Sequence, residues 1–136
     1  MTLHLLKLAV GSESLADLRG WQARRLASEG RVYHATRQQP RRGPELLDGG
    51  SIYWVIKGLV LCRQRLTGLE PAHDAAGRAV TRLLLDPRLV EVEPLPQRAF
   101  QGWRYLRPEA APEDLLRRAA GLPPALAAEL RALGCW

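Results

Sequence analysis

The sequence has few lysines, few cysteines and no long apolar run. The last two shortages each argue against a class of protein. Only Lys7 and Lys57 among the 20 basic residues are lysine. The two cysteines, Cys62 and Cys135, have no CxxC spacing and no neighbouring histidines, which argues against a disulfide framework or a zinc site. Residues 1–11 are too short and too mixed for a signal peptide or a membrane span. We therefore expect a cytoplasmic protein with no cofactor and no membrane contact.

The charge is positive and unevenly placed. The net charge is +6, and residues 31–65 hold seven basic residues against two acids. Residues 97–107 add three arginines and no acid. Arginine pairs well with phosphate and stacks on bases, so this asymmetry favours an anionic partner. The alternative is that the arginine excess reflects only the composition of a GC-rich genome.

Hydrophobic periodicity predicts a mostly β chain with one early helix. A helix is expected between Ser14 and Gly30, because Ser14 with Asp17 resembles a capping box and Gly30 suits a helix end. A polar loop is expected at residues 67–78. Strands are expected at residues 3–10, 31–37, 51–66, 79–85, 89–95 and 97–106.

These elements predict an α+β fold within a chain of 136 residues, which is long enough to bury a core without disulfides. The fold class is a small mixed or antiparallel β-barrel with a helix after the first strand. We expect residues 1–108 to form this β-barrel-like domain. The composition shifts after Pro108, and we expect residues 109–136 to form a C-terminal helical appendage.

The stretch DGGSIYWVIKG, residues 48–58, is the densest mixture of turn and strand signals. Lys57 and Gly58 predict either a tight turn between two strands or a bulge in one bent strand. Strand alternation places Ile52, Trp54 and Ile56 in the core. Tyr53 and Lys57 then lie on the opposite, less buried side.

No pattern in the sequence assembles an enzyme active site. His34 and Thr36 form one H-x-T motif, whereas the two-histidine phosphodiesterases need two. A small hydrolase centred on His34 remains an alternative, as does a strand histidine bonded to backbone. Cys62 alternates with core residues, which favours a buried and inert thiol.

Basic and aromatic residues interleave near the middle and the end of the barrel segment. Aromatic rings stack on bases and arginines hold phosphates, so this set predicts binding of RNA or another anionic ligand. The alternative for the aromatics is edge-strand packing. The predicted site residues are Arg37, Arg41, Arg42, Tyr53, Lys57, Arg63, Trp103 and Arg104.

A protein-interaction or self-association module is a further alternative. In that case the C-terminal helices dock a partner or a second copy, giving a possible homodimer. Apolar residues on the same side of the strand as Tyr53, namely Val55, Leu59 and Leu61, would then be buried at the interface.

Five segments carry a resemblance to a known family: MTLHLLKLAVG, HATRQQPRR, ELLDGGSIYWVIKG, the following RQR, and FQGWRYL. The chain resembles a family of uncharacterised alphaproteobacterial proteins defined by a domain of unknown function. The resemblance covers nearly the whole chain. It implies a small bacterial cytoplasmic protein and implies no activity.

A second resemblance concerns the layout. A strand reading LLK, a helix with a DL…WQARR run, a glycine-led apolar strand and a closing β segment are similar to PUA-like domains of the EVE and ASCH branches. The first strand lacks the tryptophan common in the EVE branch. The resemblance implies a small β-barrel that binds RNA or a modified base in an aromatic-lined pocket between barrel and helix.

Overall fold

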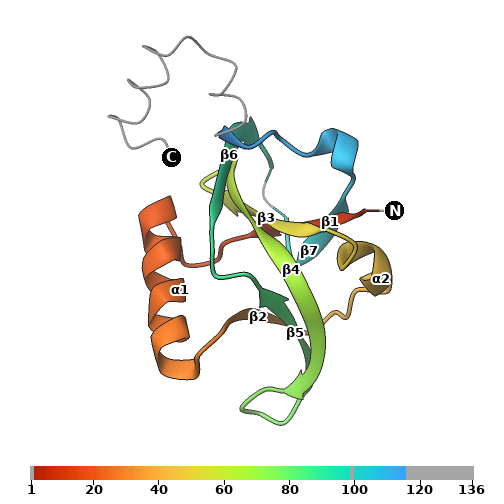
Figure 1. The fold of residues 1–136 in the computed structure, drawn as a ribbon. Coiled ribbons are helices and arrows are strands. Elements are labelled where there is room, and N and C mark those ends of the chain that lie inside the picture. Colours follow the sequence, from red (N-terminus) through yellow and green to blue (C-terminus); the bar gives the residue numbers. More distant parts are fainter. Residues whose placement is uncertain (1, 99, 116–136) are drawn as a thin grey trace.

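The computed structural model describes residues 2–98 and 100–115, and these residues form a mixed α+β fold that is mostly β (Figure 1). The predicted α+β class, with a helix after the first strand, is therefore confirmed. None of the helices in this part of the chain has the length and apolar character needed to cross a membrane. The elements are β1 (His4–Leu8), α1 (Leu15–Glu29), β2 (Val32–Thr36), α2 (Gly43–Leu46), β3 (Ser51–Ile56), β4 (Leu59–His73), β5 (Ala79–Leu85), β6 (Val90–Pro96), β7 (Trp103–Leu106) and the 3₁₀ turn η1 (Pro108–Ala110).

The long strand β4 organises the sheet. Its first half pairs with β3 on one side and β6 on the other, and its second half pairs with β5. The strand order is β2-β5-β4-β3-β1-β7, with β6 attached to β4. β1 and β3 are parallel, and the other pairs are antiparallel. The sheet bends along β4 (Figure 1). The two ends of the strand order are β2 and β7.

One core fills the inner face of the sheet and is closed by α1. Leu18 and Gln22 of the helix are buried there, next to residues from six strands. Leu5, Ile52 and Leu83 are fully buried in this core. The side chains on the other face form a second, smaller core, so the central strands are covered on both sides.

The second core corrects the expectation for Tyr53. Every residue of β3 is buried, and Tyr53 is 5% exposed. Phe100 and Ala111 pack on this face from segments that are distant in sequence. The same core holds Val55 at 1% exposure, so Val55 is already buried within the chain and is not exposed for the interface of the self-association alternative.

Local sequence signals set the ends of the elements. The Ser14 hydroxyl accepts the N–H of Asp17, and Gly30 ends α1 in the left-handed conformation, as predicted. Lys57 and Gly58 have φ angles of 49° and 78°. Positive φ at both central residues is typical of a two-residue hairpin turn, so the tight-turn alternative is confirmed.

The predicted polar loop at residues 67–78 is mostly strand. β4 continues to His73 and pairs with β5 along its whole second half. Pairing with a strong neighbouring strand outweighs the weak strand propensity of this stretch. Pro71 is tolerated because this half of β4 has β5 as its only partner strand in the described chain, and an edge strand can hold a proline.

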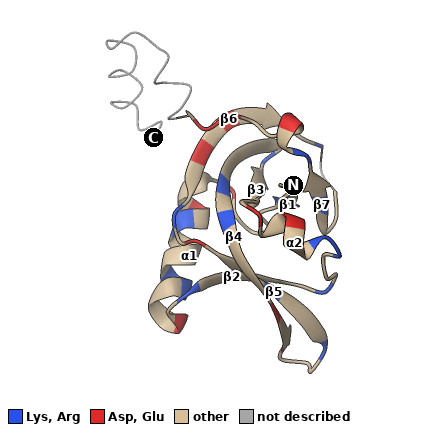
Figure 2. Cartoon of the chain, turned by 45° about the vertical axis from the view of Figure 1, so that its right-hand side comes forward, with Lys and Arg blue, Asp and Glu red and all other residues tan. Residues whose placement is uncertain are grey.

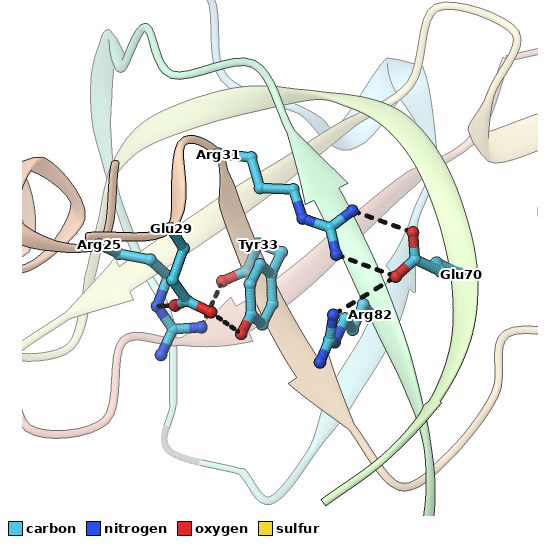
Figure 3. Close-up of polar contacts among 6 residues, drawn as sticks. All are labelled: Arg25, Glu29, Arg31, Tyr33, Glu70 and Arg82. Atoms are coloured by element: carbon cyan, nitrogen blue, oxygen red, sulfur yellow. Dashed lines mark hydrogen bonds and ion pairs between the residues drawn. The ribbon is translucent and has the colours of Figure 1, made fainter. Parts of the chain in front are cut away.

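A cluster of arginines around Tyr33 joins α1, β2, β4 and β5 (Figure 3). The guanidinium carbons of Arg25 and Arg82 lie 4.4 Å and 4.7 Å from the centre of the Tyr33 ring. The Tyr33 hydroxyl donates a hydrogen bond to Glu29. The Glu70 carboxylate accepts hydrogen bonds from both Arg82 and Arg31. These arginines are occupied by structural contacts, so they add little free positive charge to the surface.

The predicted appendage at residues 109–136 is described only through Leu115. Residues 109–115 contact the sheet, since Asp114 forms a β-bridge with Val92 and the Glu93 N–H donates to the Glu113 carbonyl. The rest of the predicted helical appendage lies outside the described residues, as does Cys135.

Candidate nucleic-acid interface

The fold separates the eight predicted site residues into different places. Arg41, Arg42 and Trp103 meet where the loop after β2 approaches β7. Tyr53 and Arg63 line a different hollow, on the outer face of the sheet. The remaining three residues are scattered, and Arg37 is exposed just beyond β2. The Lys57 amine, in the β3–β4 turn, lies 4.0 Å from a carboxylate oxygen of Glu13. The guanidinium carbon of Arg104 lies 4.7 Å from the centre of the Phe100 ring.

A cleft lies between the loop at residues 38–42 and β7. Two side chains of β7 fix this loop. The Trp103 indole N–H donates to the Gln38 carbonyl at 2.9 Å, and the Tyr105 hydroxyl accepts the N–H groups of Arg41 and Arg42 at 3.0 Å and 3.1 Å. The cleft has a volume of about 690 Å³ and is lined by Gln38, Gln39, Pro40, Arg41, Trp103 and Tyr105.

The lining of this cleft combines aromatic, amide and cationic groups. Trp103 is 8% exposed, and its ring meets the half-buried Tyr105 ring edge-on at 4.8 Å. The amides of Gln38 and Gln39 can each donate and accept hydrogen bonds. The predicted site residues do not include Tyr105 or the two glutamines, although the alternation of Trp103 and Tyr105 along β7 places the two rings on one face.

The two neighbouring arginines of the loop differ in their availability. Arg42 pairs with Glu45 through two hydrogen bonds and lies over the Tyr105 ring at 5.7 Å. This pairing lowers the pKa of the Glu45 carboxyl. Arg41 is exposed, and its side chain has no hydrogen bond or ion pair with any described residue. Arg41 is therefore the cation of the cleft that can meet an external anion.

Two basic side chains lie inside the sheet near this cleft. Lys7 of β1 is 8% exposed, between Trp54 and Trp103 on the neighbouring strands. No hydrogen bond or ion pair joins its amine to another residue in the described part of the chain, and burial lowers its pKa. His34 meets the Trp54 ring edge-on at 5.6 Å. A buried lysine without an acidic partner is rare in folded proteins, and sequence reasoning did not single it out.

The pKa of His34 is lowered to about 4, first by burial and then by the charges of Lys7 and Arg25. The neutral imidazole is therefore the stable form in the folded chain. Because His34 of the unfolded chain binds a proton near pH 6.5, the contribution of His34 to stability is fully present above that pH. This contribution is lost as the pH falls toward 4. We expect a loss of about 3 kcal/mol from this group between pH 7 and pH 4. Urea unfolding at pH 7 and at lower pH measures it.

The matched controls are two single variants. His34→Phe removes the titrating group while keeping a ring against Trp54, so its stability should depend less on pH. His73→Gln changes an exposed histidine and should behave as the parent does. If His34→Phe loses as much stability in acid as the parent, His34 is not the responsible group.

The alternatives based on catalysis receive no support from the geometry. His34 and Thr36 face the inner core, with the His34 ring against Trp54 and no second histidine near it. Burial raises the pKa of the Cys62 thiol to about 12, which keeps it protonated. Among residues 2–98 and 100–115, no group of three His, Cys, Asp or Glu side chains is arranged to hold a metal ion.

The chain is thus a small α+β protein with a bent mixed sheet and an arginine-bearing aromatic cleft at the end of β7. Residues 5–136 match the family described as "Protein of unknown function (DUF1489)", so the chain belongs to that family. No curated protein and no solved structure shows significant similarity to it.

Proposed function

We propose that the chain binds single-stranded RNA without catalysis. In this proposal the cleft between residues 38–42 and β7 receives one base, which is either an unmodified or a modified base. The observation that carries this proposal is the lining of the cleft, where two aromatic rings, two amides and one unpaired arginine meet. Its volume of about 690 Å³ falls in the range of sites that hold a small organic ligand.

Each lining group has a role in this proposal. The Tyr105 ring offers a surface for stacking, which is tolerant of base identity. The amides of Gln38 and Gln39 pair with polar atoms on the base edge. Arg41 holds the adjoining phosphate through its fork of N–H donors. The layout of the sheet and α1 is the PUA-like arrangement that we propose for the fold.

The buried Lys7 agrees with this assignment. Its charge lowers the pKa of His34, and its register partner on β7 is Trp103, so it contributes positive potential next to the cleft. Such a field favours an anionic or electron-rich ligand over a cationic one. The protein would remain in the cytoplasm, where such ligands are plentiful.

Binding to a short fluorescently labelled single-stranded RNA tests the proposal. We expect the affinity to fall steeply as salt rises, because binding releases counterions. Arg41→Ala should weaken binding by roughly five- to tenfold at low salt and reduce the salt slope by about one. The substitution keeps the backbone N–H that donates to Tyr105, so the loop retains its anchor.

Arg24→Ala is the matched control. Arg24 is exposed on α1, and Figure 1 shows this helix on the other side of the molecule from β7. Its removal changes the net charge equally. It should leave the affinity nearly unchanged. Equal weakening by both variants would mean that only net charge matters, and absence of binding at low salt would refute the function.

A further inference from the structure

A third hollow, which shares Gly49 and Arg63 with the hollow beside Tyr53, brings three arginines together on the outer face of the sheet. Its volume is about 380 Å³, and it lies where β4, the chain before β6 and Gly49 approach one another. It shares no lining residue with the aromatic cleft. Its lining residues are Gly49, Arg63, Arg65, Asp86, Arg88 and Val90.

Arg63 is held rigidly at one side of this hollow. Its Nε and Nη2 atoms donate to the two carboxylate oxygens of Asp114 at 2.7 Å and 2.8 Å. Its Nη1 atom donates to the Ser51 hydroxyl at 3.0 Å. A guanidinium fixed by two partners is already oriented, so little conformational entropy is lost when it accepts a further contact.

Arg65 and Arg88 provide the free charge. Arg65 lies two residues after Arg63 on β4, so the two side chains lie on the same face of the strand. Basic positions along β4 are drawn in blue in Figure 2. Arg65 and Arg88 are exposed, and neither side chain has a hydrogen bond or ion pair with another residue in ranges 2–98 and 100–115. Both can therefore turn toward a ligand in the hollow.

The acidic side chains near the hollow already have hydrogen-bond partners within the protein. Asp86, the one acid in the lining, accepts the backbone N–H of Arg88 at 2.9 Å within its own turn. Asp114 is occupied by Arg63. Three guanidinium groups against these two carboxylates leave one net positive charge, which suits a bound phosphate group.

We propose that this hollow is a phosphate-binding site formed by Arg63, Arg65 and Arg88. Arginine forks match the geometry of phosphate oxygens better than that of monatomic anions. The phosphate belongs either to a small molecule with a terminal phosphate or to the backbone of a nucleic acid. The site stands independently of the base-binding cleft, because it uses none of the same side chains.

Titration of the ¹⁵N-labelled protein with pyrophosphate, followed through the arginine Nε–Hε signals, tests this proposal. We expect saturable shifts at Arg63, Arg65 and Arg88, and none at Arg24. The double variant Arg65→Ala/Arg88→Ala should weaken pyrophosphate binding about tenfold or more, since each arginine supplies charge-assisted hydrogen bonds. Arg24→Ala should leave it unchanged, because Arg24 lines neither this hollow nor the cleft.

Two further titrations identify the source of the phosphate. Shifts with a 5′-mononucleotide indicate a terminal phosphate, and shifts only with an oligonucleotide lacking terminal phosphate indicate a backbone phosphate. If the alanine double variant does not fold, Arg65→Lys/Arg88→Lys keeps the charge but removes the forks and should still weaken binding. Equal shifts at Arg24, lack of saturation with all three probes, or full binding by the double variant would overturn the proposal.

Discussion

The substitution Gly50→Ala is expected to destabilise the fold by about 3 kcal/mol or more, because overpacking against a rigid backbone cannot be relieved locally. A Cβ atom at this position would lie 2.2 Å from the Leu3 carbonyl oxygen and 2.3 Å from the Leu46 carbonyl oxygen. Both are backbone atoms, so relief requires moving the start of β1 or the end of α2. Gly50 also donates its N–H to Leu46.

Urea unfolding of Gly50→Ala and of the parent chain measures this cost. Gly20→Ala is the matched control, since Gly20 lies within α1 and its added Cβ would meet only the flexible Arg24 side chain at 3.5 Å. The control should gain about 0.5–1 kcal/mol from better helix propensity. Unchanged stability of Gly50→Ala would show that the approach of the three segments is looser than described.

The second large effect is expected at Gln64, which centres a buried polar network. Its amide oxygen accepts the Trp54 indole N–H at 2.8 Å and an N–H of Gln22 at 2.7 Å. Its amide nitrogen donates to Gln22 at 2.6 Å and to the Asp86 carbonyl at 3.0 Å. Gln64→Leu keeps a side chain of similar size but leaves these partners unsatisfied, at a cost of about 3 kcal/mol.

Thermal or urea unfolding of Gln64→Leu measures this loss. The exposed Gln101 supplies the comparison, and Gln101→Leu should change stability by less than about 0.5 kcal/mol. Gln64 joins α1 to β3 and to the chain after β5. A small effect at Gln64 would therefore mean that α1 is held by apolar packing alone.

The local signals in the sequence were sufficient to predict much of the fold. The α1 boundaries follow from Ser14 and Gly30, and the β3–β4 turn follows from Gly58 with its neighbouring lysine. The second half of β4 was missed because its strand character comes from pairing with β5 and not from its own residues. Periodicity reports local preference, and tertiary pairing can override it.

The candidate sites depended on contacts that the sequence does not display. Trp103 meets Gln38 across 65 positions, and Arg63 meets Asp114 across 51. The sequence therefore indicated Arg63 as a basic site residue without showing that its side chain was already paired with Asp114. It also placed Tyr53 on the less buried side, because nothing in the strand itself indicates that Phe100 joins the core on that face.

The central claim is that RNA enters the cleft at the end of β7. Its most direct measurement is the indole N–H signal of Trp103 during titration with a short single-stranded RNA, with the Trp54 indole as internal reference. Both indoles donate within the protein, Trp103 to Gln38 and Trp54 to Gln64. The proposed function predicts a saturable shift at Trp103 and little change at the buried Trp54. Saturable RNA binding that leaves the Trp103 signal unmoved would contradict it.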